Sequence, residues 1–403
     1  MTSLIGKKYD YKIVLIIALI NSPLMKNLGD FGGIIAIFLL SCMIPSCKSK
    51  PIIEKTDLKT LCSIFILCAT QSIIFYLFGK MELPYLSRGI SSSLFRIIEL
   101  FFIYKFINYY RHKSIDYLTD GLFLAYSINI VNAIILFGPL SVLKASLAIF
   151  TGGFGEAGAI TDKALEVSDA ILLIMPLVSV FYLFLFTKKK KRSFLIRSFF
   201  AIFIALLAYK RIAIAAGMLA LLLLLIQPFY NKRAIKLLGV FAVSLCLCYI
   251  YFIKSKLIYL YASLYDVNLM SRDRIWTAID DRYQFAWNYW GEGWGYISKY
   301  LHLYKNTTLD LAVGGIHNDI LKFYIDLGFF GFIVYSSFFL IYIPLFLWRK
   351  FNPRLSFCFW IGQSYLFFLY LTDNSSIYTS NQFVAYIFPF SIYIITQNNK
   401  SPK

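Results

Sequence analysis

Residues 211–228 read RIAIAAGMLALLLLLIQP, with one charged residue, at the first position. A run of about 20 apolar residues is long enough to cross a bilayer as a helix, since each helical residue adds about 1.5 Å. Similar runs lie on either side of it, at 193–209 and 234–253. This repetition predicts an all-α protein that is built from membrane-spanning helices.

The rest of the chain follows the same pattern. Of its 403 residues, 59% are hydrophobic and 19% are aromatic. We count about twelve apolar runs of spanning length, and expect the first to be retained because it lacks a small-residue cleavage site. The sequence therefore predicts a polytopic integral membrane protein with a single membrane domain over residues 1–403. The cores of the runs are 11–25, 29–45, 58–78, 90–109, 117–138, 168–187, 193–209, 211–228, 234–253, 320–347, 355–372 and 382–396.

The net charge of +19 is distributed between the spans. If the N-terminus is cytoplasmic, the main basic clusters all fall on the cytoplasmic side of a twelve-span path, as the positive-inside rule requires. The positive charge then reflects topology and contact with anionic membrane lipid, and it does not indicate nucleic acid. Both termini are predicted to be cytoplasmic. The clusters lie at residues 7–12, 48–59, 111–113, 188–192, 232–236 and 349–354.

The longest polar stretch, residues 255–319, lies between the ninth and tenth spans. The same topology places it outside the cytoplasm, as a loop inserted between these two spans. It is too long for a plain connection, so we expect it to contain short helices. Residues 273–289 are compatible with an interfacial helix rich in Trp and Tyr. The glycine-rich residues 291–295 should form a turn.

Spans seven and eight are joined by a tight hairpin that contains Lys210 and Arg211. Cations on the external side run against the positive-inside trend. They could reach toward lipid headgroups, or they could bind a phosphate group at the outer face of the membrane. Arg211 is the stronger candidate for binding phosphate, because its guanidinium is planar, always charged and able to form two parallel hydrogen bonds.

Three more polar residues are predicted on the same side. Arg272 and Arg274 could pair with nearby acidic residues, or they could join Arg211 to neutralise a pyrophosphate. His317 lies where the loop returns to the membrane, and its imidazole could either be structural or take a proton from a hydroxyl group. The chain has only three histidines, scattered along it, so we predict neither a zinc site nor a cofactor.

Two pairs of opposite charges lie at helical spacing inside the predicted spans. Arg96 and Glu99 are three residues apart, and Lys322 and Asp326 are four apart, so each pair is expected to form an ion pair. A proton or ion path through such residues would suit a transporter, which is an alternative to an enzyme.

The order of these features resembles the O-antigen polymerase and O-antigen ligase superfamily of bacterial inner-membrane glycosyltransferases. The resemblance covers residues 205–345, and the N-terminal half matches only in its hydropathy. The sequence departs from the family pattern at two positions: it has Asp326 where Glu is common, and Gly315 where a second His often stands. The matching pieces are Lys210-Arg211-Ile212-Ala213, Arg272 with Trp276 and the glycine-rich turn, and His317-Asn318-Asp319-Ile320-Leu321 followed by Asp326-Leu327-Gly328-Phe329-Phe330-Gly331.

The resemblance implies a GT-C-like membrane fold and metal-independent glycosyl transfer from an oligosaccharide linked to undecaprenyl pyrophosphate. It assigns catalytic roles to His317, Arg211 and Arg272, and substrate binding to Lys210, Arg274, Asn318 and Asp326. It also implies the bacterial inner membrane, an active site at the periplasmic face and a possible chain-length regulator as partner.

Three functions remain open at this stage. An O-antigen polymerase would extend the glycan on its lipid carrier, and an O-antigen ligase would transfer it to lipid A–core. A polysaccharide flippase would do no covalent chemistry. We favour the polymerase, because the Phe-, Ile-, Tyr- and Lys-rich composition resembles serotype-specific polymerases.

Overall fold

The computed structural model describes residues 10–21, 29–47, 50–151, 169–208, 211–266, 269, 272–304 and 315–397. Within these residues all regular elements are helices and none is a strand, which confirms the all-α prediction. Four helical stretches in this part of the chain are long and apolar enough to cross a membrane, and shorter apolar helices accompany them. The chain is therefore a polytopic membrane protein, and the number of twelve spans stays a prediction. The four stretches are Lys55–Leu77, Leu83–Phe137, Lys232–Lys254 and Asp319–Lys350.

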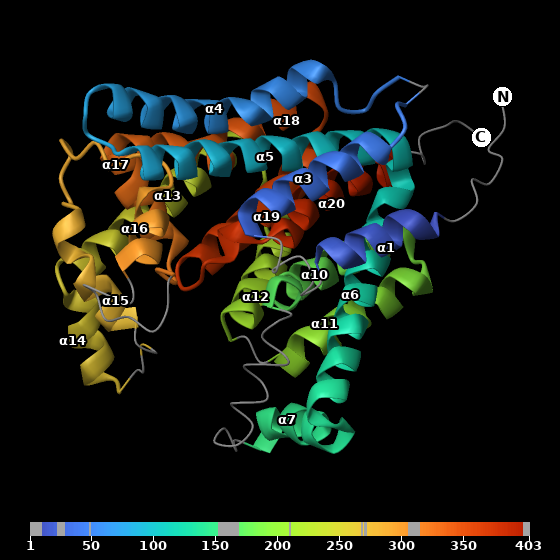
Figure 1. Ribbon diagram of the computed structural model, residues 1–403. Helices are drawn as coiled ribbons and strands as arrows, with labels where there is room; N and C mark the ends of the chain where they lie inside the picture. The colour runs from blue at the N-terminus through green and yellow to red at the C-terminus, as the bar shows by residue number, and fades with distance from the viewer. Residues whose placement is uncertain are drawn as a thin grey trace. The chain divides into compact units, whose positions relative to one another are not determined.

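The chain divides into two compact units, each assembled from segments that are far apart in sequence (Figure 1). The first unit comprises residues 1–53, 101–225 and 378–403, and the second comprises residues 54–100 and 226–377. Helix α5 (Leu83–Tyr110) contributes to both. A single membrane domain over residues 1–403 stays a prediction.

The first unit is stabilised by helix packing and by a cluster of charges. Helix α10 packs against α11 and α12, and α1 packs against α6. Arg197 of α11 forms ion pairs of 3.1 Å with Asp116 and 3.0 Å with Asp120, both in α6. The helices of this unit, besides the second half of α5, are α1 (Tyr11–Ile20), α3 (Gly29–Met43), η1 (Arg111–Lys113), α6 (Ser114–Phe137), α7 (Pro139–Thr151), α9 (Asp169–Leu172), α10 (Met175–Lys189), α11 (Arg192–Ala208), α12 (Arg211–Leu225) and α20 (Thr379–Gln397).

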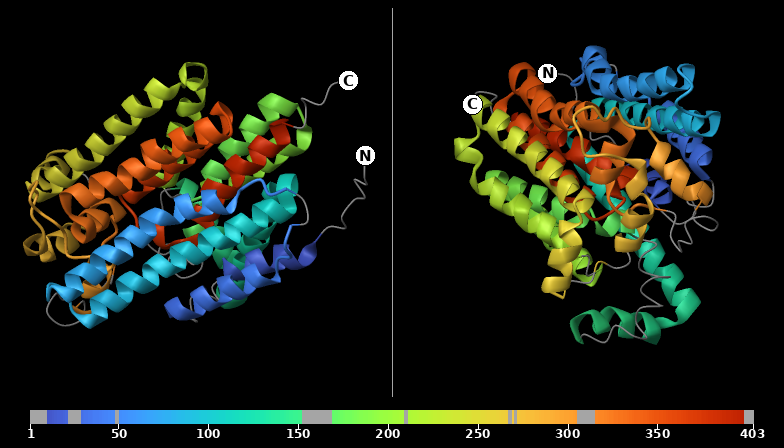
Figure 2. Two further views of the ribbon diagram at one scale, coloured as in Figure 1. Left: turned by 90° about the horizontal axis from the view of Figure 1, so that it is seen from above. Right: turned by 90° about the vertical axis from the view of Figure 1, so that its left-hand side faces the viewer.

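The second unit contains the long polar stretch and the helices on which it rests. Helix α13 packs along α17, which both views of Figure 2 show as neighbouring yellow-green and orange helices. Helix α18 packs against α19. Asparagine side chains cap the start of three of these helices: Asn231 accepts two backbone N–H groups of α13, and Asn318 and Asn352 each accept one, of α17 and α19 respectively. The helices of this unit, besides the first half of α5, are α4 (Lys55–Leu77), η4 (Gln227–Phe229), α13 (Lys232–Lys254), α14 (Leu257–Leu264), α15 (Arg272–Ala278), η5 (Asp280–Arg282), α16 (Tyr296–Tyr304), α17 (Asp319–Ser337), the π-helical turn η6 (Phe338–Tyr342), α18 (Ile343–Lys350), α19 (Pro353–Tyr370) and η7 (Ser375–Ile377).

The polar stretch contains short helices, as expected, but its helical parts differ from the prediction. Helix α15 ends at Ala278, so the helix expected over residues 273–289 is wrong beyond that point. Residues 283–295 are mostly extended or turn-forming. The reason lies outside the local sequence, because the backbone of this segment bonds to α17.

Helix α17 is broken at Gly328, which has a φ of +74°. The break frees backbone groups that the polar stretch then uses: Glu292 N–H donates to the Ile325 carbonyl at 3.0 Å, and Phe329 N–H donates to the Tyr289 carbonyl at 2.8 Å. The Gln71 side chain of α4 also donates to the carbonyl of Leu327 at 3.3 Å. A broken helix at membrane depth requires such partners, because lipid offers none.

Candidate functional site

The Arg272 helix and the His317 loop are joined by one buried side chain. Trp276, one helical turn after Arg272 in α15, is 2% exposed. Its indole Nε1 donates a hydrogen bond of 3.1 Å to the carbonyl oxygen of Ile316, the residue directly before His317. Two of the three sequence pieces that carried the family resemblance are therefore in contact.

Arg272 is half-buried at the start of α15. Its Nε is fully covered and has no hydrogen-bond partner among the residues described. The guanidinium lies within Coulombic range of the Tyr249 hydroxyl, which itself donates to the Leu371 carbonyl at 2.8 Å. A buried N–H group without an acceptor costs free energy unless a ligand completes it. Arg274, in contrast, is exposed.

His317 is held between two buried residues. Its backbone has a φ of +49°, in the left-handed region that residues with a side chain seldom adopt. The preceding Ile316 is fixed by Trp276, and the following Asn318 caps α17 by accepting the N–H of Leu321 at 2.9 Å. Strained backbone of this kind is retained where the surrounding structure enforces it, and often at functional sites. The fold therefore fixes the backbone that carries the half-buried imidazole.

Asn318 has a second buried group that the helix cap does not use. The residue is fully buried, and its Nδ2 has no hydrogen-bond partner among the described residues. An amide donor without an acceptor thus lies directly beside His317. It is consistent with the substrate-binding role that the resemblance implied, which stays a prediction.

The first turn of α17 contains an ion pair of Lys322 with a different partner from the one predicted. Lys322 contacts Asp319 at 3.5 Å, and Asp319 is fully buried. The predicted pair of Lys322 with Asp326 is wrong as a contact, because no ion pair joins them. A spacing of three residues suits a helical pair as well as a spacing of four, and Asp326 has other partners.

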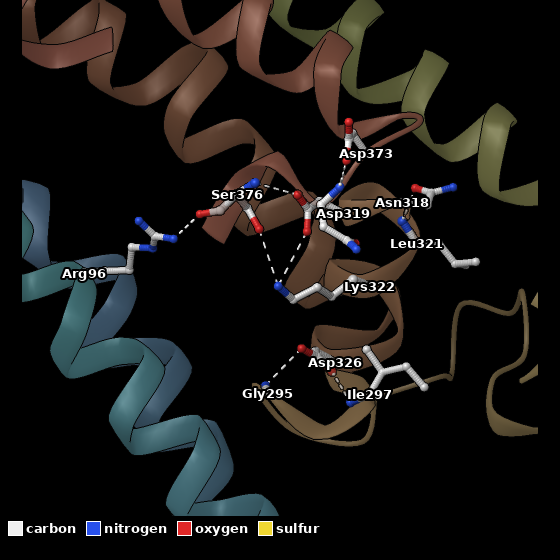
Figure 3. Close-up of polar contacts among 11 residues, drawn as sticks. Arg96, Gly295, Ile297, Asn318, Asp319, Leu321, Lys322, Asp326, Asp373 and Ser376 are labelled. Atoms are coloured by element: carbon white, nitrogen blue, oxygen red, sulfur yellow. Dashed lines mark hydrogen bonds and ion pairs between the residues drawn. The ribbon is translucent and has the colours of Figure 1, made fainter. Parts of the chain in front are cut away.

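The same ion pair connects α17 to the segment that follows α19 (Figure 3). The Ser376 N–H donates to Oδ2 of Asp319 at 2.6 Å, and the Ser376 hydroxyl lies 3.4 Å from Nζ of Lys322. The Arg96 guanidinium donates to the Ser376 carbonyl and pairs with Glu99, which confirms the predicted pair of Arg96 and Glu99. No sequence pattern assigned a role to Ser376, or to Asp319, which stands in the matching motif two residues after His317.

Asp326 holds the glycine-rich turn. Its two carboxylate oxygens accept the backbone N–H groups of Gly295 at 2.9 Å and Ile297 at 3.0 Å, as Figure 3 shows. Gly291, Gly293 and Gly295 all have positive φ, so the expected turn is present and depends on glycine. The carboxylate orients the segment that follows the turn, and its predicted role in substrate binding stays a prediction.

Other charged residues of the polar stretch form ion pairs, one of them with the last residue of α13. Asp280 pairs with Lys254 at 3.0 Å, and Asp281 pairs with Arg282 at 3.3 Å. Arg282 also lies over the ring of Tyr300, 4.7 Å from its centroid. Burial raises the pKa of the Glu292 carboxyl, while the charge of Arg282 acts in the opposite direction.

The remaining predicted site residues belong to the first unit. Arg211 begins α12, and its side chain, together with all of Lys210, lies outside the described residues. The convergence of Arg211 with Arg272 and His317 thus stays a prediction. Within the second unit, the structure brings the Arg272 helix and the His317 loop together.

The described residues form an all-α integral membrane protein with a polar segment anchored on a broken helix, and this segment presents a guanidinium and an imidazole. Residues 196–336 match the family model described as O-antigen ligase. For this segment, the match confirms the predicted resemblance to the O-antigen polymerase and ligase superfamily. The matched family is glycosyltransferase-like. Comparison with curated proteins and with solved structures gives no match.

Proposed function

We propose that the protein is an O-antigen polymerase. It transfers a growing glycan from undecaprenyl pyrophosphate to the next lipid-linked repeat unit at the periplasmic face of the inner membrane. The observation that carries the proposal is the hydrogen bond from Trp276 to Ile316, because it places the Arg272 helix against the loop that presents His317. The family match supports it, since residues 196–336 include Arg211, Arg272 and His317.

The proposed reaction uses two kinds of group. His317 accepts the proton of an acceptor sugar hydroxyl, while the oxygen of that hydroxyl forms a bond to the anomeric carbon of the donor sugar. The bond from that carbon to the pyrophosphate oxygen breaks, and its electron pair leaves with the pyrophosphate. Arg272 and Arg211 bind the departing anion, with Arg274 and Lys210 as further cations. In this proposal arginine charge stabilises the leaving group, and no metal ion is needed.

The buried Nε of Arg272 supports this assignment. A lipid pyrophosphate supplies the oxygen acceptor that the described residues do not provide for this N–H group. A flexible ammonium in the same place would offer charge without the fixed fork of donors. The strained backbone of His317 and the buried amide of Asn318, which has no acceptor among the described residues, are adjacent in the chain and support a binding role for this loop.

The topology proposed with this function has both termini in the cytoplasm and the polar stretch 255–319 in the periplasm. The substrates are oligosaccharides linked to undecaprenyl pyrophosphate, which reach the site from the membrane. A chain-length regulator protein is the expected partner. Anionic lipid contacts the basic clusters on the cytoplasmic side.

Replacing Arg211, Arg272 or His317 with Ala in the parent bacterium tests the proposal. We expect lipopolysaccharide gels to show core that bears a single repeat unit, with the ladder lost. Bare core with accumulated lipid-linked polymer would instead identify a ligase. Loss of lipid-linked units from the outer leaflet would identify a flippase, and a full ladder from all three variants would reject the site.

A further inference from the structure

Gly315 lies two residues before His317, and its lack of a side chain leaves room for a neighbouring side chain. A methyl group at Gly315 would overlap the side-chain amide of Asn374 and would lie 4.0 Å from Nε2 of His317. The Asn374 amide and the His317 imidazole therefore both border the small volume that a side chain at Gly315 would fill. Asn374 belongs to the segment after α19, far from His317 in sequence.

The same two segments are fixed to each other by buried groups. Asp319 accepts the Ser376 N–H at 2.6 Å, and Lys322 bridges Asp319 and Ser376. His317 precedes Asp319 by two residues, as Asn374 precedes Ser376 by two. This anchor, made of Asp319, Lys322 and Ser376, therefore holds together the two backbone segments that carry His317 and Asn374. Asn374 is half-buried, and its own N–H donates to Oδ1 of Asp373 at 2.8 Å, which fixes its backbone.

The chemistry of an asparagine amide indicates which substrate group it binds. The amide carries donors and an acceptor, so it matches a sugar hydroxyl, which also donates and accepts. A pyrophosphate oxygen only accepts and is better bound by the permanent charge of arginine. Within the described residues the Asn374 side chain has no hydrogen bond that would occupy it.

We propose that Asn374 is a substrate-binding residue of the same site and that its amide binds the acceptor sugar beside the hydroxyl that His317 deprotonates. This inference rests on the proposed glycosyl transfer. It gives Gly315 a defined role, which is to leave room for the amide next to the imidazole. The anchor of Asp319, Lys322 and Ser376 is then the support that holds acceptor-binding groups from two segments together.

A double-mutant cycle tests the inference. The variants are Asn374→Ala, Gly315→Ala and the double variant, and we measure the rate of glycan transfer per amount of protein in membranes supplied with lipid-linked repeat units. Gly315 does not have positive φ, so alanine fits its backbone and acts through the space it takes. We expect each single variant to lose about 3- to 10-fold in rate, the effect of one neutral hydrogen bond.

The double variant is expected to be no slower than the slower single variant, because alanine at 315 acts by displacing the Asn374 amide. A loss equal to the product of the single losses would overturn the inference, as would a normal rate for Asn374→Ala. Asn288→Ala, an exposed residue of the polar stretch, is the matched control and should keep the normal rate.

His317→Ala is measured beside these variants to separate the two proposals. If it transfers glycan at the normal rate, the proposed function fails. If it is inactive while Asn374→Ala has the normal rate, only the role of Asn374 fails. The thermal unfolding temperature of each purified variant in detergent identifies rate losses that arise from unfolding, and variants are compared at a temperature at which all are folded.

Discussion

The indole Nε1 of Trp276 and the carbonyl oxygen of Ile316 are 3.1 Å apart and buried, although 40 residues separate them in sequence. This hydrogen bond joins the helix that begins with Arg272 to the loop that presents His317. A buried carbonyl requires a partner. The indole therefore serves both the packing of the polar stretch and the placement of the proposed catalytic groups.

Replacing Trp276 with Phe tests this connection. The change keeps an aromatic ring and removes the N–H donor, so the Ile316 carbonyl loses its partner. We expect transfer activity to fall about tenfold and the free energy of unfolding to fall by about 1–2 kcal/mol. Trp287→Phe is the control, because Trp287 is 72% exposed. Equal activities of the two variants would show that the indole bond does not position the site.

Arg272 should be sensitive to shape as well as to charge. Arg272→Lys keeps the positive charge and loses the planar set of donors, including the buried Nε–H. We expect Arg272→Ala to abolish the ladder and Arg272→Lys to keep only a small part of it, as measured on lipopolysaccharide gels. Lys80→Ala removes an exposed cation from the same unit and should leave the ladder intact. Full function of Arg272→Lys would mean that charge alone suffices.

The break in α17 requires glycine at position 328. A side chain there would overlap the backbone of Trp290, and the φ of +74° adds strain. Gly79 has a similar φ of +68° with open space around it, so Gly79→Ala measures the strain alone, about 1 kcal/mol. We expect Gly328→Ala to lower the unfolding temperature in detergent by several degrees more than Gly79→Ala. Equal shifts would show that the polar stretch is not seated in the break.

Asp326 should act by holding the glycine-rich turn. Asp326→Asn replaces one acceptor oxygen with a donor group that faces a backbone N–H, which costs about 1–3 kcal/mol locally. Hydrogen–deuterium exchange of residues 295–297 should therefore become faster, with the exchange of α13 unchanged. Asp326→Glu keeps both oxygens and should remain close to normal in transfer. Unchanged exchange in Asp326→Asn would contradict the anchoring role.

Local sequence patterns predicted much of this fold. Apolar runs predicted the long helices, and the three-residue spacing of Arg96 and Glu99 predicted their ion pair. The apolar runs on either side predicted where the polar stretch begins and ends, and the side of the membrane on which it lies stays a prediction. The class of the protein followed from these patterns together with the motif order in residues 205–345, which the match over residues 196–336 confirms.

The contacts that build the site could not be predicted from local sequence patterns, because they join segments that are far apart in sequence. Asp326 was expected to pair with Lys322 four residues away, and instead accepts N–H groups about 30 residues away. The helix expected over residues 273–289 ends at Ala278, since the backbone beyond it bonds to the broken α17. Asn374 carries no motif, and only the space beside Gly315 reveals it.

The central claim is that this site elongates a glycan on its lipid carrier. The most direct test is to reconstitute the purified protein in liposomes that contain only lipid-linked repeat units, without lipid A–core, and to separate the products by length. We predict a ladder of lipid-linked polymer from the unaltered protein and only single units from His317→Ala. Transfer that occurs only after lipid A–core is added, with no elongation before it, would contradict a polymerase and identify a ligase.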